Sequence, residues 1–214
     1  MANTNAPLSE VAICIMAASA LDDKTLTSLD DNTVIGRFMA SNYGRVRDQT
    51  LRSHVWNCAK TRKLLAPVPL TSDDFGWDYK YTLPEDCLRL LPLRNKGQWS
   101  GGRIPHELEG RDIRTNYGPV LPVIYIQAQP NAALLDPLLA AVIAGKLAVL
   151  GSHKITGKAS YTDKALTLFK MAWDEAVHTN ALELGTPEHV ENDAFVSSSS
   201  QGQLDFLSVR GVGL

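Results

Sequence analysis

Apolar residues recur at helical spacing in the first part of the chain. Ser9 is a typical helix cap, and a first helix is predicted after it. The apolar positions on one face of this helix are Val11, Cys14, Ile15, Ala18 and Leu21. Residues 22–32 are polar and predict a loop, after which a second helix is expected over residues 33–60. Its apolar side carries Ile35, Met39, Tyr43, Val46 and Thr50.

A second helical block begins at Asp136 and Pro137. Aspartate at the cap followed by proline at the first helical position is a strong start signal. One apolar stripe then continues through Leu139, Ile143, Leu147 and Leu150. Residues 151–157 predict a connector, and a fourth helix is expected to carry Ala165, Leu166, Phe169, Trp173 and Val177. Amphipathic helices must bury their apolar sides, so these four should pack on one another as a bundle.

The chain between these blocks has the pattern of strands. Most of the 11 prolines of the full sequence lie in this part of the chain. Short extended runs occupy residues 77–83, 87–93, 111–115 and 121–127. Residues 77–81 alternate aromatic and charged side chains, the period of a strand with one face in water. One face of this strand, with Trp77, Tyr79 and Tyr81, is predicted to be buried either within its own sub-domain or against a neighbouring subunit.

The predicted fold class is therefore α+β. Residues 1–63 and 131–187 form a four-helix bundle core, residues 64–130 form an inserted β-rich sub-domain, and residues 188–214 form an extended C-terminal arm. The arm has few apolar residues and, with four acids against Arg210, a net charge of −3. This is the composition of a segment that orders on a partner. The arm residues predicted to contact that partner are Phe195, Leu204, Phe206, Leu207 and Arg210.

Composition excludes several classes of protein. The 214 residues are 44% hydrophobic and 21% charged, with a net charge of −2, which is typical of a globular protein and not of a strongly basic nucleic-acid binder. The three cysteines are far apart, so they are expected to be free thiols in a reducing cytoplasm. The N-terminus has no signal-peptide pattern. The longest apolar stretch, residues 138–150, is interrupted by Lys146 and is too short to span a bilayer.

No motif predicts a catalytic, cofactor or metal site. The glycines at 151 and 157 resemble a phosphate-binding loop, but Ala159 stands where Ser or Thr should bind magnesium. The five histidines lack metal-ligand spacing. Carboxylates that could serve a polysaccharide hydrolase occur at Asp73, Asp74, Asp78, Glu85, Asp86, Glu107 and Glu109, and they are interpreted as solvated turn residues.

A cluster of cations in the second helix raises the possibility of nucleic-acid binding. The residues concerned are Arg37, Arg45, Arg47, Arg52, Arg62 and Lys63. They do not fall on one clean stripe of the predicted helix, so a solvated or inter-subunit face is the favoured interpretation.

Two strings of residues resemble a known family. The first is Arg52-x-His54-x-Trp56-Asn57, and the second runs from Tyr79 through Tyr81, Leu83, Pro84, Asp86, Cys87 and Leu88 to Arg89. Residues 11–17 and the Asp136-Pro137-Leu138 helix start are similar as well. Together, over residues 8–183, they resemble the tail tubular protein A family, the head-to-tail adaptors of short-tailed bacteriophages.

The resemblance implies a structural role without catalysis or cofactors. Such adaptors form a ring, a dodecamer, beneath the portal protein, carry the tail nozzle protein and in some cases tail fibres, and surround the channel through which phage DNA passes. The expected location is the virion tail, after synthesis in the host cytoplasm. Two other hypotheses remain: a tail-associated polysaccharide hydrolase that uses the middle-region carboxylates, and a helical nucleic-acid-binding protein.

Overall fold

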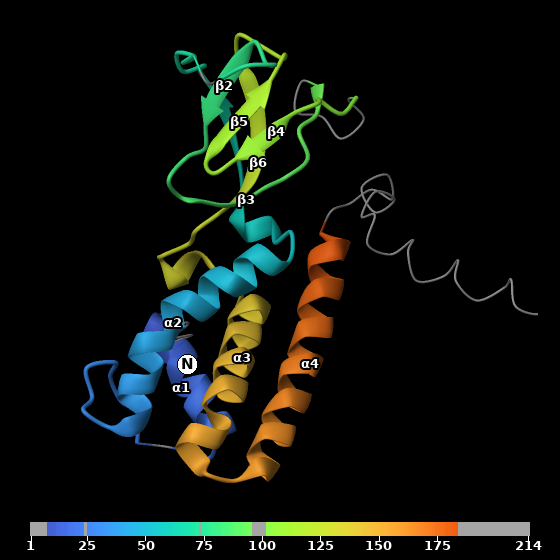
Figure 1. Ribbon diagram of the computed structural model, residues 1–214. Coiled ribbons are helices and arrows are strands. Elements are labelled where there is room, and N and C mark those ends of the chain that lie inside the picture. Colours follow the sequence, from blue (N-terminus) through green and yellow to red (C-terminus); the bar gives the residue numbers. More distant parts are fainter. Residues whose placement is uncertain (1–7, 24, 73, 96–101, 184–214) are drawn as a thin grey trace, which may run out of the picture.

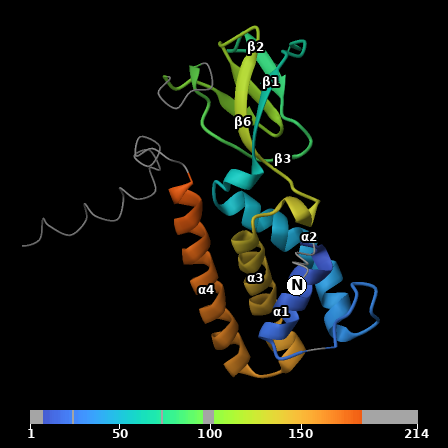
Figure 2. The same ribbon diagram turned by 180° about the vertical axis from the view of Figure 1, so that it is seen from behind.

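The computed structural model describes residues 8–23, 25–72, 74–95 and 102–183. Within these residues, helices form one end of the molecule and two small antiparallel sheets form the other (Figures 1 and 2). The mixed helix and strand content confirms the predicted α+β class. The arm, residues 188–214, lies outside the described residues.

The first two helices begin where the sequence predicts. Helix α1 spans Glu10–Ala20, and the Ser9 hydroxyl accepts a hydrogen bond from the amide of Ala12 at 3.1 Å. Helix α2 spans Val34–Ser53, and Thr33 caps it in the same way. Both caps satisfy amides that have no partner within the helix.

Helix α2 ends earlier than predicted. A 3₁₀ turn over Asn57–Ala59 and strand β1, Lys60–Leu65, occupy residues that the apolar pattern assigned to the helix or to the start of the insertion. The cause is Trp56, which folds back beneath the helix end. Its indole nitrogen donates to the carbonyl of Thr50 at 2.9 Å, and its side chain is almost fully buried. The bond satisfies a carbonyl in the last turn and stabilises the end of the helix.

Helix α3, Pro137–Thr156, begins as predicted but runs further. The carboxylate of Asp136 accepts hydrogen bonds from the amides of the second and third helical residues, at 2.8 and 3.2 Å. The predicted connector over residues 151–157 is wrong, because all but the last of these residues are helical. Gly151 lies inside the helix, and its lack of a side chain makes room for Phe38, whose ring would lie 2.9 Å from an added Cβ. Gly157, with φ 67°, ends the helix in the left-handed conformation.

Helix α4, Ala159–Leu182, completes the helical part. Helices α1, α2 and α4 each pack mainly on α3, and α3 lies between α2 and α4 in Figure 1. The α3–α4 contact is close because Gly145 faces the backbone of Phe169, where an added Cβ would lie 3.0 Å from the Cα. Ala165 and Ala176 are the buried apolar residues of α4.

The β sub-domain, defined here as residues 60–127, contains two three-stranded sheets. The first has the order β1-β6-β3, with β6 Leu121–Gln127 and β3 Cys87–Leu90. The second has the order β2-β5-β4, with β2 Tyr79–Thr82, β5 Asp112–Thr115 and β4 Glu107–Glu109. The four predicted strands are present. The sequence analysis missed β1, of which it assigned only Lys60 to a helix, and β4, whose three residues are all exposed.

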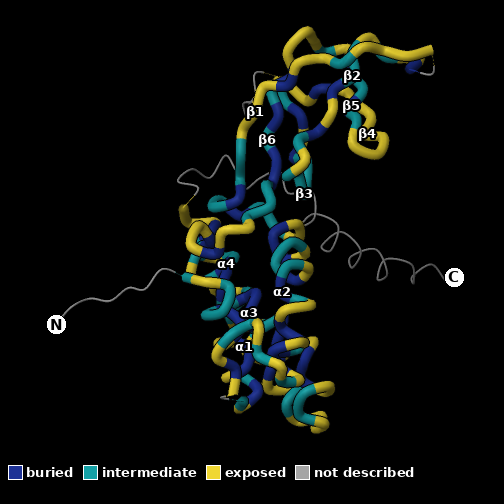
Figure 3. The backbone as a smooth tube through the Cα atoms, turned by 90° about the vertical axis from the view of Figure 1, so that its left-hand side faces the viewer, coloured by how far each residue is buried: buried dark blue, intermediate teal, exposed yellow. Residues whose placement is uncertain are grey.

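Two apolar cores stabilise the two parts. The core of the β sub-domain contains Leu65, Tyr81, Leu83, Leu93, Ile104, Ile113, Leu121, Val123 and Tyr125. The helical core extends into the first sheet through Leu91 and Ile126. Strand β6 is thus mostly buried, whereas β1 beside it is largely exposed (Figure 3). Because β6 contributes to both cores, the two parts are joined by packing as well as by the chain.

Helix α3 is also long and apolar enough to cross a membrane. Its 20 residues include a window of mean hydropathy 1.5, and no other helix in the described ranges meets the same test. Half of this window is buried inside the protein. The central helix of a packed helical domain has the same composition, so hydropathy alone does not make α3 a membrane span.

The end of α4 is tied to the turn before β1 by one side chain. The carboxamide oxygen of Asn180 accepts the amide of Asn57 at 2.8 Å, and its nitrogen donates to the carbonyl of Val55 at 2.9 Å. In return, the side chain of Asn57 donates to the carbonyl of Asn180 at 2.9 Å. Nearby, the rings of Trp56 and Trp173 meet edge to face with centroids 5.7 Å apart.

We predict that Asn180→Ala lowers the free energy of unfolding by about 1–3 kcal/mol, because it leaves two backbone groups of the turn without partners. Urea unfolding followed by circular dichroism measures the change. Lys170→Ala, at an exposed position of the same helix, is the matched control and should change stability little. Equal destabilisation by the two substitutions would contradict the role of Asn180.

Candidate partner-binding surface of the β sub-domain

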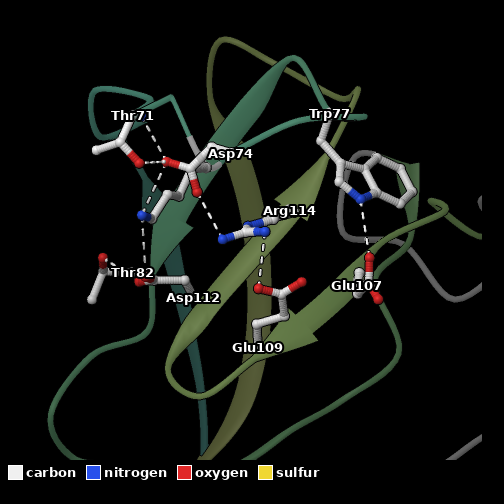
Figure 4. Close-up of polar contacts among 9 residues, drawn as sticks. Thr71, Asp74, Trp77, Thr82, Glu107, Glu109, Asp112 and Arg114 are labelled. Atoms are coloured by element: carbon white, nitrogen blue, oxygen red, sulfur yellow. Dashed lines mark hydrogen bonds and ion pairs between the residues drawn. The ribbon is translucent and has the colours of Figure 1, made fainter.

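The three predicted aromatic residues do not form one open face. Tyr81 is fully buried in the core of the β sub-domain, and its hydroxyl donates to the carbonyl of Tyr117 at 2.9 Å. Tyr79 is half-buried and covers Gly118, where an added Cβ would lie 2.5 Å from its ring. Trp77 precedes β2 and donates to the carboxylate of Glu107 at 3.2 Å (Figure 4). Tyr81 therefore stabilises its own sheet, and Trp77 and Tyr79 are the members that reach the surface.

The other predicted contact residues belong to the arm. They are Phe195, Leu204, Phe206, Leu207 and Arg210, and all of them lie outside the described residues. Their role in partner binding stays a prediction.

An ion cluster centred on Asp74 covers one face of the second sheet (Figure 4). The side chain of Asp74 is only 2% exposed. One of its oxygens accepts the amide and the hydroxyl of Thr71, at 2.7 and 2.9 Å, and lies 3.3 Å from the ammonium of Lys80. The other lies 2.7 Å from the guanidinium of Arg114. The pKa of Asp74 is lowered to about 2, chiefly by the hydrogen bond from the backbone amide of Thr71. The hydroxyl of Thr71 and the ammonium of Lys80 lower it further.

This cluster offsets the repulsion between two cations of the sheet. Lys80 on β2 and Arg114 on β5 are directly opposite each other, and like charges in that register repel. Asp74 lies between the two cations and pairs with both. Two further carboxylates complete the charge balance: Asp112 is 3.6 Å from Lys80, and Glu109 is 2.9 Å from Arg114.

The cluster also fixes a loop that presents an apolar side chain to water. Asp74 holds the turn that begins at Thr71, and Phe75 follows it directly with 83% of its surface exposed. Gly76, with φ 86°, adopts a left-handed conformation that other residues rarely take. Phe75 is therefore an exposed apolar side chain on a loop that the Asp74 cluster fixes. The sequence analysis missed it, although an aromatic residue between polar loop residues was a visible signal.

The remaining predicted carboxylates each have their own surroundings. Asp86 accepts a hydrogen bond from the hydroxyl of Tyr125 at 3.2 Å. The pKa of Tyr125 is raised to about 12, chiefly by burial and next by the negative charge of Asp86. Asp78 and Glu85 are exposed, and Asp73 lies outside the described residues. Asp74 is a poor general acid at neutral pH, because that role needs a raised pKa and its own is lowered.

Two cavities are open to solvent near these residues. One, of about 340 Å³, lies beside Trp77 and is lined also by Ile104, Thr115 and Tyr117. The other, of about 290 Å³, lies between the turn at Asn57 and the end of α4. Within the described ranges, no three His, Cys, Asp or Glu side chains come together as a metal site would require. The three cysteines are free, as predicted.

Comparison with known proteins identifies no relative: no protein-family model matches the chain, and no curated protein matches it.

We predict that the Asp74 cluster makes the stability of the protein depend on acid pH. Because the folded pKa of Asp74, about 2, lies below the value of about 3.9 in an unfolded chain, its contribution is complete above about pH 4. It is lost as the pH falls towards 2. The urea midpoint of the wild type should therefore exceed that of Asp74→Asn above pH 4, and the gap should narrow at lower pH.

Asp78→Asn is the matched control, since it changes an exposed carboxylate of the same region. Its urea midpoint should follow that of the wild type across the whole series. A difference between wild type and Asp74→Asn that does not change with pH would contradict the lowered pKa.

Proposed function

We propose that this chain is a structural head–tail adaptor of a short-tailed bacteriophage, without enzymatic activity. Copies of it form a ring, a dodecamer by resemblance, between the portal protein and the tail nozzle protein and around the DNA exit channel. In this proposal the four helices are the bundle of the adaptor. The observation that carries the proposal is the position of the residues that resemble the tail tubular protein A family.

The first string of resemblance lies at the joint between the helices and the sheets. Trp56 ends α2 and contacts Trp173 of α4, and Asn57 exchanges hydrogen bonds with Asn180. His54 packs against the ring of Trp56, with centroids 4.8 Å apart. All three residues thus hold α4 against the start of the β sub-domain.

The second string continues the same joint on the sheet side. The guanidinium of Arg52, in α2, donates to the carbonyl of Leu88 in β3, and Arg89 donates in return to the carbonyl of Arg52 at 3.5 Å. Within the β sub-domain, the hydroxyl of Tyr81 donates to the carbonyl of Tyr117. The carboxylate of Asp86 accepts a hydrogen bond from the hydroxyl of Tyr125. Several residues of the resemblance, among them Arg52, Asn57 and Arg89, therefore fix the two parts relative to each other. An adaptor that transmits force between portal and tail needs such a rigid joint and no catalytic residue.

The partners follow from the same proposal. Trp77 and Tyr79 at the surface of the β sub-domain contribute a lateral contact between subunits, together with the exposed Phe75. The arm, residues 188–214, docks on the portal through its apolar residues. Tail fibres attach to the assembled tail, and phage DNA passes through the ring without sequence-specific contacts. The site of action is the virion tail, after synthesis in the host cytoplasm.

We predict that truncation after Glu188 weakens binding to the portal ring of the same phage but leaves thermal unfolding unchanged. The arm has too few apolar residues to order on its own and takes its stability from the partner. Sedimentation of portal rings with full-length or truncated chain measures the binding. Equal binding of the two proteins would remove the arm from portal docking, and no binding of either would contradict the adaptor proposal.

The two competing hypotheses make different predictions. A polysaccharide hydrolase would cleave host polysaccharide and lose that activity in Asp74→Asn, Asp78→Asn or Asp86→Asn. The ion pairs of Asp74 and the hydrogen bond from Tyr125 to Asp86 argue against this hypothesis, since both carboxylates already have protein partners. A nucleic-acid-binding protein would bind DNA with an affinity that falls steeply as salt rises. An adaptor shows neither behaviour.

A further inference from the structure

Each sheet of the β sub-domain has two edge strands, and other parts of the chain bind two of these four edges. The edge strands are β1 and β3 in the first sheet and β2 and β4 in the second. At β2, the amide of Val68 donates to the carbonyl of Lys80 at 2.8 Å. At β3, the carbonyl of Leu88 accepts a hydrogen bond from the guanidinium of Arg52. These contacts occupy main-chain groups that an edge strand otherwise presents to water.

The outer edges of β1 and β4 are open. Across the described ranges, no strand or isolated bridge pairs with either of them on the side away from its own sheet. Both strands also expose a leucine: Leu64 of β1 is 70% exposed, and Leu108 of β4 is 49% exposed. An open edge is a template on which a strand of another chain can form main-chain hydrogen bonds.

The two open edges carry opposite charge. Strand β1 contains Lys60, Arg62 and Lys63 and no acid, a charge of +3. Strand β4 contains Glu107 and Glu109 and no cation, a charge of −2. Among the described residues, no ion pair involves a cation of β1. Burial, and next the charge of Arg62, lower the pKa of Lys60, so these cations crowd one another without a carboxylate beside them.

The glutamates of β4 can accept a second partner. Glu109 binds Arg114 and Glu107 binds Trp77, in both cases through Oε2. A carboxylate has two oxygens and accepts several hydrogen bonds, so Oε1 of each glutamate remains for a cation from outside. All three residues of β4 are exposed, and such a cation can therefore reach them.

One copy cannot pair its own two open edges. Strands β1 and β4 belong to different sheets, and Figure 3 places them on opposite sides of the β sub-domain. Like charges directly opposite each other are destabilising, which disfavours β1 with a second β1 and β4 with a second β4. The complementary pair is β1 of one copy with β4 of another. Because different patches meet, this contact leaves one open edge at each end and can repeat until a ring closes.

The side chains of the two strands also match in register. When Leu64 lies opposite Leu108, the two exposed leucines form one cross-strand pair. Lys63 then lies opposite a glutamate in either strand direction, because β4 has a glutamate on each side of its leucine. Apolar pairs and pairs of opposite charge both stabilise neighbouring strands.

We propose that β1 of one copy pairs with β4 of the next, and that this strand pairing holds neighbouring subunits together in the ring. The inference rests on the adaptor function proposed above and names the strands that form its lateral interface. It commits to a second copy of this chain, in a head-to-tail arrangement. Pairing of β1 with another β1, or of either edge with the portal, is an alternative that the experiment separates from it.

The test is cross-linking of a double variant, Leu64→Cys with Leu108→Cys, in a background in which Cys58 and Cys87 are replaced by alanine. Cys14 remains because it is fully buried, and burial raises its pKa to about 12. A flexible bis-maleimide, which tolerates a shift of one residue in register, is added to concentrated protein with and without portal rings. Head-to-tail pairing gives a ladder of covalent dimers, trimers and larger species on a denaturing gel.

A charge reversal separates a specific contact from random collision. Lys63→Glu, added to the double variant, should reduce the ladder several-fold, because it places an acid opposite the glutamates of β4. Lys170→Glu is the matched control, since it makes the same change at an exposed lysine of α4, and it should leave the ladder unchanged. Circular dichroism checks that each variant is folded.

The possible outcomes distinguish this contact from the adaptor function. Covalent dimers of a Leu64→Cys variant alone would show β1–β1 pairing and overturn the proposal. A ladder that survives Lys63→Glu, a product that stops at the dimer, cross-links to the portal alone, or no cross-link would overturn it as well. If the chain still binds the portal ring in that case, the adaptor function stands with a different lateral interface. If the ladder forms but the portal is not bound, the strand pairing stands and the adaptor function fails.

Discussion

Helix α3 is the element on which the rest of the helical part depends. Helices α1, α2 and α4 all pack on it, and nine of its 20 residues are buried. Two glycines set the distances: Gly145 lets α4 approach closely, and Gly151 makes room for Phe38 of α2. Because a single helix separates α2 from α4, each of these has an inner face in a core and an outer face in water.

Local signals predicted the beginnings of elements better than their ends. Ser9 and Asp136 cap helices as predicted, since a cap is a contact between residues close in sequence. The end of α2 is stabilised by Trp56, which folds back to Thr50, and Gly151 packs within a helix against Phe38, more than 100 residues earlier. Apolar spacing alone contains neither contact, so the predicted end of the second helix at residue 60 and the predicted connector at residues 151–157 were wrong.

The surface of the β sub-domain was predicted only in part. The alternation at residues 77–81 indicated a strand with one aromatic face, and Tyr81 does face the core. The ion cluster was not predictable, because it follows from the register that places Lys80 opposite Arg114. Asp74 pairs with both cations and relieves the repulsion between them, but this role is visible only once the register is known. The exposed position of Phe75 follows from the same anchor.

The proposed function joins these observations. Several residues that resemble tail tubular proteins, among them Arg52, Trp56 and Asn57, lie at the joint between the helices and the sheets. A rigid two-part subunit with different surfaces on its two sides is suited to a closed ring between two larger assemblies.

The central claim is that the chain is a component of a phage tail. Cryo-electron microscopy of purified particles of the phage that encodes it tests this claim most directly. The account predicts a ring of copies of this chain directly below the portal, with density that fits the four helices and the two sheets. Particles that contain the portal and the tail but lack this chain would contradict it.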